Sequence, residues 1–438
     1  MARPLHEHPL VRWIVAFLYI AVAGCGGGGG ATPADAAIDN APPIDAPDLG
    51  ALCGVTPGAA WQRCHANPLV EGMRPAADAG KIEWTQADPT VLYDADDHLW
   101  KAWWSTVIVT DCSQITTPNR ELDIKYAESD DGVAWRIQAE PVLRSHRDPG
   151  DWDYSTAETP TVIKVPGAVP ARRYALIYAG GNDNVLKVLG QTGWQLGVAF
   201  SADGKQFTRI SATESPYAGQ STPFARIEGL ALLAKDAFPS VTGVDHGIIA
   251  DPEVIAYGGK FHLYFSSVAV DAQGALVANT YGISHATSTD LVHWTAATGN
   301  PIPALYGGGQ PTILADGNQL TMYFGQDSNA DLATIPSALF PTLGFWKATS
   351  SDASTWTRLS MTTRDFTWLP SDTGEDLGLL NGAAIARGPD GNVRLYYGGW
   401  GTKSAPAGSC VYVYDRTKTP ATIVSVPGTN DLLLAIRR

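Results

Sequence analysis

The sequence predicts an all-β fold, a five-bladed β-propeller made of four-stranded antiparallel blades. Three repeated features carry this prediction: a strand-start pattern that occurs five times, an alternating aromatic run about ten residues after each copy, and a turn motif in four of the five repeats. The equivalent positions of the five repeats are Asp88, Thr159, Asp251, Gln310 and Asn381, and successive positions are 71, 92, 59 and 71 residues apart. Repeats of this size cannot bury a sheet face alone and stack radially.

The first two strands of each blade are predicted by the first two features. The strand-start copies read ADPTV, ETPTV, ADPEV, GQPTI and, degraded, LNGAA, and begin at Ala87, Glu158, Ala250, Gly309 and Leu380. The aromatic runs that follow alternate with a period of two, which is typical of a half-buried strand.

The third and fourth strands are predicted by the motif A-x-S-x-D, followed by an aromatic residue four positions on. We expect a third strand, a turn in which the Asp side chain binds its own backbone, and a ring that closes the fourth strand over the blade core. The Asp and aromatic positions are Asp131 and Trp135, Asp203 and Phe207, Asp290 and Trp294, and Asp352 and Trp356.

The N-terminal segment is typical of targeting. Arg3 and Arg12 precede an apolar run at residues 13–23, which ends in Val-Ala-Gly-Cys with Cys25. This layout predicts a signal peptide, and it resembles a bacterial lipobox in which the Cys is lipidated; an ordinary secretory signal is the alternative. Residues 26–50 are rich in Gly, Ala, Pro and Asp, which predicts a flexible tether. We therefore expect an exported protein that is lipid-anchored in the bacterial cell envelope.

Four further cysteines are an even number in an exported chain, which favours two disulfides. Of the three possible pairings we expect Cys53 with Cys64, which are close in sequence, and Cys112 with Cys410, which would join the first and last blades. The alternative is that one or more are free and buried. The predicted organisation is signal peptide 1–25, tether 26–50, N-terminal extension 51–80 and propeller 81–438.

The net charge of −14 argues against nucleic acid or an anionic membrane surface as partner. The 14 Trp and 16 Tyr residues favour carbohydrate, because flat rings beside carboxylates stack on sugars. Trp152 and Trp400 lie in predicted loops and are candidate stacking platforms, with ordinary loop packing as the alternative. We expect a monomer that contacts the membrane only through its anchor.

From about Lys81 onward the chain resembles the five-bladed glycosidase superfamily that includes glycoside hydrolase family 43 and the invertase-like enzymes. The residues that carry the resemblance are Pro141-Val142-Leu143, Trp152-Asp153, Thr159-Pro160-Thr161-Val162, Tyr178-Ala179-Gly180-Gly181, Asp88-Pro89 and Asp251-Pro252. This resemblance is specific for the fold and much less so for activity.

The resemblance implies three carboxylates at the central axis. Asp88 matches the general base of the first blade, and Asp251 matches the Asp that orients the acid and tunes its pKa. The fourth blade has Gln310 where the family has the acid Glu, and an amide cannot donate that proton. The nearest substitute is Glu158, two residues before Pro160 in the second blade, so an acid/base set of Asp88, Glu158 and Asp251 is expected.

Other residues of the pattern are weaker candidates. Strand-initial Asp-Pro is also good turn chemistry, so Asp88 and Asp251 could simply end loops. Glu253 lies two positions after Asp251 and is expected to point along the blade rather than to the axis. His246 is a candidate pocket residue or a surface residue. The fifth blade has Asn381 where the family often has a His, and no cofactor is expected; a bound axial cation is the alternative, which the sequence does not indicate.

Hydrolysis of a glycoside through an axial acidic pocket is the leading function. The expected catalytic residues are Asp88, Glu158 and Asp251, and the expected substrate-binding residues are Gln310, Trp152, Trp400, Asn381 and His246. The alternative is a non-catalytic carbohydrate-binding propeller that has lost the acid, and Gln310 favours it. A sialidase-like propeller is disfavoured, because the S-x-D turns lack the spacing of Asp boxes and no suitable Arg triad is present.

Overall fold

The computed structural model describes residues 48–114, 121–189, 191–326, 344–360, 363–367, 379–401, 408–409, 411–415 and 422–438. The expected signal peptide with Cys25, most of the expected tether, and Cys410 lie outside these residues. Within the described ranges, no helix has the length and apolar character needed to cross a membrane.

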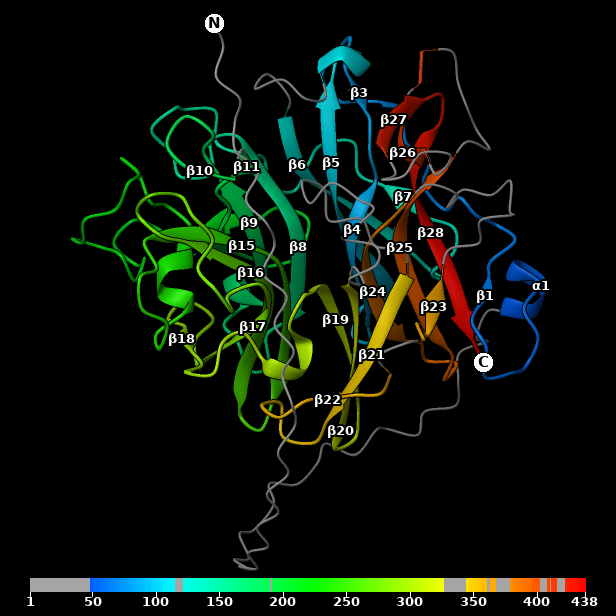
Figure 1. Cartoon of the computed structure of the whole chain (residues 1–438). Coiled ribbons are helices and arrows are strands. Elements are labelled where there is room, and N and C mark those ends of the chain that lie inside the picture. Colours follow the sequence, from blue (N-terminus) through cyan, green and yellow to red (C-terminus); the bar gives the residue numbers. More distant parts are fainter. Residues whose placement is uncertain are drawn as a thin grey trace, which may run out of the picture. The chain divides into compact units, whose positions relative to one another are not determined.

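Five antiparallel sheets form the predicted five-bladed propeller (Figure 1). Blade one contains β4 (Ala87–Asp94), β5 (Leu99–Val109), β6 (Glu121–Ser129) and β7 (Arg136–Ile137), and blade two contains β8 (Thr156–Lys164), β9 (Tyr174–Gly181), β12 (Gln195–Ser201) and β13 (Thr208–Arg209). Blade three contains β15 (His246–Tyr257), β16 (Lys260–Val270), β17 (Gly282–Ser288) and β18 (Thr295–Ala296), and blade four contains β19 (Gly308–Asp316), β20 (Gln319–Gln326), β21 (Gly344–Ser350) and β22 (Thr357–Arg358). Blade five contains β24 (Leu379–Arg387), β25 (Val393–Gly401), β28 (Thr429–Arg437) and β1 (Gln62–Arg63).

Smaller elements decorate these blades. Strands β2 (Arg74–Pro75) and β3 (Ile82–Glu83) extend blade one, β14 (Leu230–Leu232) pairs with β12, and β23 (Phe366–Thr367) pairs with β21. Two hairpins are formed by β10 (Lys187–Val188) with β11 (Gln191–Thr192) and by β26 (Val411–Asp415) with β27 (Thr422–Val426). The helical elements are α1 (Leu49–Cys53), η1 (Cys112–Gln114), η2 (Pro170–Arg172), η3 (Ala234–Ala237) and η4 (Pro303–Leu305).

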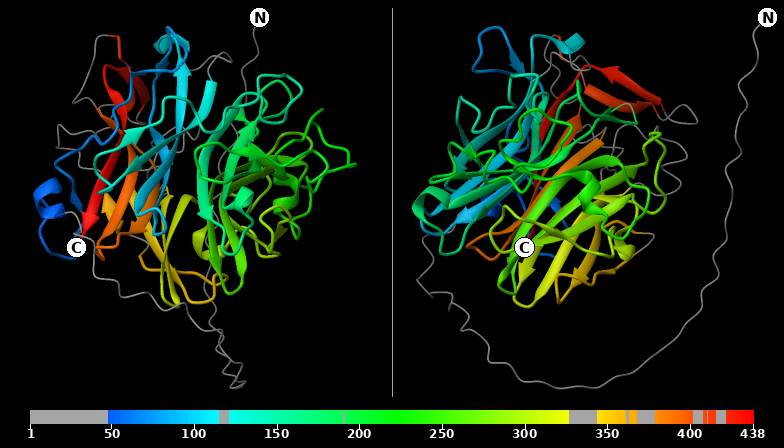
Figure 2. Two further views of the ribbon diagram at one scale, coloured as in Figure 1. Left: turned by 180° about the vertical axis from the view of Figure 1, so that it is seen from behind. Right: turned by 90° about the vertical axis from the view of Figure 1, so that its left-hand side faces the viewer.

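The outer strand of blade five comes from the N-terminal part of the chain. Gln62 of β1 pairs with Ile436 of β28, and Arg63 pairs with Ala435. The two strands lie side by side, β1 in blue and β28 in red (Figure 1 and the left view of Figure 2). The propeller therefore uses a strand from the segment 51–80, which the sequence suggested only as an extension.

The predicted turn motif is present in four blades, and in each the Asp carboxylate accepts the backbone N–H two residues on. In blade one, Asp131 Oδ1 accepts the backbone N–H groups of Val133 and Ala134, each at 2.8 Å, and Ser129 Oγ accepts the N–H of Gly132 at 2.9 Å. Equivalent bonds occur around Asp203, Asp290 and Asp352. In each case the aromatic residue directly precedes the fourth strand, as predicted.

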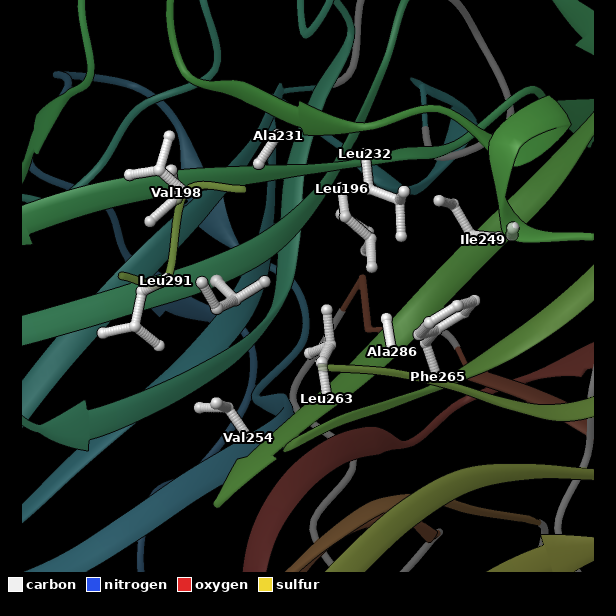
Figure 3. Packing of buried hydrophobic residues seen from close by; sticks show 14 of the residues in the cluster. Leu196, Val198, Ala231, Leu232, Ile249, Val254, Leu263, Phe265, Ala286 and Leu291 are labelled. Atoms are coloured by element: carbon white, nitrogen blue, oxygen red, sulfur yellow. The ribbon is translucent and has the colours of Figure 1, made fainter. Parts of the chain in front are cut away.

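Apolar side chains are buried between each pair of neighbouring blades. Between blades two and three, Leu196 and Val198 of β12 pack with Leu263 and Phe265 of β16 (Figure 3). Each such side chain contributes roughly 1.5–3 kcal/mol when it is fully buried. Because both faces of the sheets are covered, strands such as β9 are buried along their whole length.

The expected disulfide between Cys53 and Cys64 is confirmed. It connects α1 to the residue that directly follows β1. Cys112 is also disulfide-bonded, whereas Cys410, its expected partner, lies outside the described residues.

Candidate axial pocket

The first strand of each of blades one to four carries the same β-bulge. In blade one, Ala87 pairs with Ser105 and Thr90 pairs with Trp103, so that Asp88 and Pro89 together face one residue of β5. The same register shift occurs in β8, β15 and β19. A proline fits at this point because it has no N–H to contribute to the ladder.

The residue before the proline, here called the bulge residue, has a left-handed backbone in all four blades. The φ angles are 50° for Asp88, 46° for Thr159, 49° for Asp251 and 51° for Gln310. This conformation costs about 1–2 kcal/mol for a residue other than glycine, and such strain is often found at functional sites. In blade five, Leu380 pairs with Gly399, which places Asn381 at the bulge position, but its side chain is outside the described part.

The bulges surround an axial pocket to which all five blades contribute. Part of the pocket is open to solvent. Its lining includes Asp88, Thr159, Asp251, Glu253, Gln310 and Gly382, together with the proline after each bulge residue. Among the described residues, the lining contains three carboxyl groups and no Lys, Arg or His, so this part of the pocket favours neutral or cationic ligand groups over anionic ones.

Asp88 has a buried carboxylate oxygen, Oδ1, without a hydrogen-bond partner among the described residues. Burial raises the pKa of Asp88 well above its ordinary value, and the negative charges of Asp251 and Glu158 raise it further. An unpaired oxygen of this kind is available to bind a water molecule or a ligand hydroxyl.

Asp251 is held more firmly than Asp88. Its Oδ2 accepts a hydrogen bond of 2.7 Å from Ser266 Oγ, and its backbone N–H donates to Thr159 Oγ1 at 3.2 Å. Burial raises the pKa of Asp251 to about 6, although the Ser266 hydroxyl lowers it. A carboxylate fixed in this way is suited to orienting its neighbours.

Glu253 also lines the pocket, contrary to the expectation that it would point along the blade. Its Oε1 accepts the backbone N–H of Ile313 at 2.8 Å and the hydroxyl of Thr312 at 3.4 Å, and its Oε2 accepts the hydroxyl of Thr161 at 3.2 Å. Burial raises the pKa of Glu253 to about 7, and these three donors oppose the shift. The bulge between Ala250 and Glu253 breaks the simple alternation on which the expectation depended.

The sequence repeats contain a deviation that could have identified Glu253 as a residue of interest. The position after the proline, here called the post-proline position, is Thr90, Thr161 and Thr312 in blades one, two and four. Each of these hydroxyls accepts a backbone N–H from the first strand of the next blade. Glu253 occupies the same position in blade three, and it makes the same bond to Ile313 with a carboxylate instead of a hydroxyl.

Gln310 lies in the pocket at the blade-four position where the family resemblance implies the acid. Its backbone N–H donates to Ser266 Oγ at 2.9 Å. Ser266 therefore connects the bulge of blade three to that of blade four, since it also donates to Asp251.

Glu158 is not part of the pocket lining. Its Oε1 accepts a hydrogen bond from the indole N–H of Trp194, near the start of β12. Glu158 remains close enough to influence Asp88 through its charge. Glu158, the acid expected from the sequence, thus lies near the pocket, but its carboxyl group is hydrogen-bonded to Trp194.

The two expected stacking platforms are buried, which corrects the sequence-based expectation. Trp152 is 0% exposed, and its indole N–H donates to the carbonyl of Glu228 at 2.7 Å. Trp400 is 9% exposed and makes an edge-to-face contact with Trp84, with ring centroids 5.7 Å apart. Both rings pack within the fold, as in the alternative explanation, and neither lines the pocket.

His246 is also absent from the pocket lining. It is the first residue of β15, several residues before the bulge, and its Nδ1 lies 2.7 Å from Asp245 Oδ2. Across the described part of the chain, no cluster of three or more His, Cys, Asp or Glu residues has an arrangement that could hold a metal ion.

No family model matches the sequence, and no curated protein matches it. Solved structures are similar in fold. The structure of a BT0996 RGII complex has 15% identity and a TM-score of 0.55, with 84% of the present sequence and 91% of the other covered. A structure named Glycoside hydrolase has 15% identity and a TM-score of 0.54, with 85% and 91% covered. Zg3597, a family 117 glycoside hydrolase from the marine bacterium Zobellia galactanivorans, has 13% identity and a TM-score of 0.49, with 86% and 89% covered. At 15% identity, the first two similarities show a shared fold.

Proposed function

We propose that the protein is a glycoside hydrolase that cleaves a carbohydrate in the axial pocket, within the superfamily that includes glycoside hydrolase family 43 and the invertase-like enzymes. One observation carries the proposal: Asp88 and Asp251 line the same pocket, and their hydrogen bonding differs. Asp88 Oδ1 has no hydrogen-bond partner among the residues that the structure describes, whereas Asp251 is bound by Ser266. Two carboxyl groups in unlike environments are the basis of glycosidase acid/base chemistry.

In this proposal Asp88 activates the attacking water. Its Oδ1 accepts a proton from water while the water oxygen attacks the anomeric carbon. Asp251, fixed by Ser266, orients the reacting groups and holds negative charge beside the developing oxocarbenium ion. The absence of basic residues from the described part of the lining favours a neutral sugar over a uronate or a sulfated sugar.

The test is hydrolysis of a panel of aryl glycosides and neutral oligosaccharides by wild-type protein, Asp88→Asn and Asp251→Asn. We expect the wild type to cleave at least one substrate and Asp88→Asn to lose about 10²-fold or more of kcat, in the range for a general acid/base group. Asp130→Asn, in an exposed turn, is the matched control and should retain wild-type activity. An Asp88→Asn variant with undiminished kcat would contradict the role of Asp88.

The alternative function is carbohydrate binding without catalysis. Gln310 favours it, because the amide occupies the position of the family's proton donor and cannot act as an acid. Saturable binding of a neutral oligosaccharide by calorimetry, without release of reducing ends over days, would support this alternative and contradict hydrolysis.

A lipid anchor at Cys25 is a further part of the proposal. The lipobox-like end of the apolar run supports it. Metabolic labelling with a fatty acid should label the wild-type chain and not Cys25→Ser, and the wild type should fractionate with the cell envelope. A wild-type chain without label would contradict lipidation.

A further inference from the structure

We propose that Glu253 is the proton donor to the leaving oxygen and supplies from blade three the carboxyl group that Gln310 does not provide in blade four. This inference rests on the proposed hydrolytic function. It concerns one residue of the axial pocket that neither the family resemblance nor the strand periodicity assigns to catalysis.

The first argument is where the carboxyl group of Glu253 lies. The residue belongs to β15, but its Oε1 contacts the backbone of Ile313 and the hydroxyl of Thr312, both on β19 of blade four. Thr312 is two residues after Gln310 on the same strand. Glu253 thus brings a carboxyl group to the first strand of blade four, whose bulge residue Gln310 has none, and it does so as part of the pocket lining.

The second argument is that the fold does not require a carboxyl group at this position. Blades one, two and four accept the backbone N–H of the next blade with a threonine hydroxyl at the post-proline position. In blade five the position is Ala383. A threonine could therefore fulfil the structural role of Glu253, and the carboxyl group adds a titratable proton that the interblade contact does not need.

The third argument is that the neighbours of Glu253 suit both of its protonation states. The hydroxyls of Thr161 and Thr312 donate to the ionised carboxylate, and each also accepts a backbone N–H from the next blade. A hydroxyl oxygen has two lone pairs, so either threonine can also accept the proton of the neutral acid. The pKa of Glu253, raised to about 7 by burial, keeps a large fraction protonated near neutral pH.

The chemical step balances. The bond between the anomeric carbon and the glycosidic oxygen breaks, and that oxygen takes the proton of Glu253 and leaves as an alcohol. Water forms the new bond to the anomeric carbon and gives its proton to Asp88. Glu253 ends ionised and Asp88 ends protonated, and proton exchange with solvent through the open pocket restores both groups.

The test uses two variants of the full protein and substrates that differ only in the leaving group. Glu253→Thr introduces the residue that blades one, two and four already have, so that the Ile313 N–H keeps an acceptor. Glu253→Gln keeps the length of the side chain and an acceptor oxygen. The substrates are the 2,4-dinitrophenyl and phenyl glycosides of one sugar. Dinitrophenolate leaves without being protonated, whereas the phenyl leaving group needs a proton from the acid to depart as phenol.

We expect both variants to lose about 10²–10⁴-fold of kcat on the phenyl glycoside and less than 10-fold on the dinitrophenyl glycoside. Asp88→Asn should lose activity on both substrates, because water activation is needed in each case. Gln310→Glu added to Glu253→Thr should restore activity on the phenyl glycoside by placing a carboxyl group back in blade four. Equal losses on the two substrates, or no loss, would overturn the assignment of Glu253.

This comparison separates failure of the inference from failure of the proposed function. If wild-type protein cleaves the dinitrophenyl and phenyl glycosides and the variants do the same, hydrolysis holds and Glu253 is not the acid. If the wild type cleaves neither compound, nor any other glycoside of the panel, the hydrolytic function and the inference both fail. Thermal unfolding of Glu253→Thr and Glu253→Gln shows whether each variant is folded before its kinetics are interpreted.

Discussion

Gly382 of blade five packs directly against Asp88 of blade one. A Cβ atom on residue 382 would lie 2.7 Å from Asp88 Oδ1 and 3.0 Å from its Cα. Gly382 occupies the position at which the other four blades have the proline that follows the bulge residue. The absence of a side chain at this one position leaves room for Oδ1 of Asp88.

Gly382→Ala is predicted to displace the Asp88 carboxyl group, because contacts below 3.0 Å force one of the partners to move. We expect kcat to fall by about 10-fold or more, with a small change in Tm. Gly299→Ala is the matched control, since a Cβ there meets no atom within 4 Å. Equal activity of the two variants would show that the position of Asp88 does not depend on Gly382.

Ser266→Ala is predicted to raise the pKa of Asp251, because it removes the hydroxyl that donates to Oδ2. It also removes the acceptor of the Gln310 N–H. Ser105→Ala is a matched control, because Ser105 has the equivalent place in blade one and accepts the Thr159 N–H. The pKa of Asp251, followed by carboxyl NMR, should rise in Ser266→Ala and stay unchanged in Ser105→Ala.

The pH dependence of kcat/KM is predicted to be bell-shaped with a maximum at about pH 6 or above. Hydrolysis needs one ionised and one protonated carboxyl group. The pKa values of Asp251 and Glu253 are raised to about 6 and about 7, and that of Asp88 is raised as well. The rising and falling limbs of the profile therefore occur at higher pH than they would for ordinary carboxyl groups, which titrate near pH 4. A maximum at pH 4–5 would contradict this prediction.

The free energy of unfolding is predicted to fall as pH rises from about 4.5 to about 7 on account of Glu253. Over this range the folded state holds the proton of Glu253 and the unfolded state releases it, because the folded pKa is about 7 and the ordinary value is 4.5. Glu253→Gln removes this contribution. Its Tm should therefore decline less than that of the wild type between pH 5 and pH 8, as measured by calorimetry. Equal declines in the Tm of the wild type and of Glu253→Gln would be inconsistent with a raised pKa of Glu253.

The fold was predictable because each blade repeats the same local chemistry. The turns at Asp131 and Asp203 bind their own backbone in the predicted way, and so do those at Asp290 and Asp352. The role of β1 was not predictable, since a two-residue strand has no periodicity of its own and owes its place to pairing with β28.

The candidate site was predictable only in part. The Asp-Pro pairs pointed to Asp88 and Asp251, and both residues line the pocket. The direction of Glu253 was missed, because alternation along a strand does not continue through a bulge with a left-handed residue. Trp152 was misjudged because the burial of a loop tryptophan depends on distant partners, here the carbonyl of Glu228.

The pairing of Gln62 with Ile436 also has a consequence for how the protein is made. A ribosome releases the residues of β1 long before those of β28, so the fifth blade stays incomplete until nearly the whole polypeptide has been synthesised. Contacts of such sequence separation form slowly, because the intervening chain must first be ordered. Until β28 is made, β1 and β25 of blade five lack their pairing partner, and unpaired strand edges of this kind favour aggregation. A truncation that removes β28 leaves both strands without that partner.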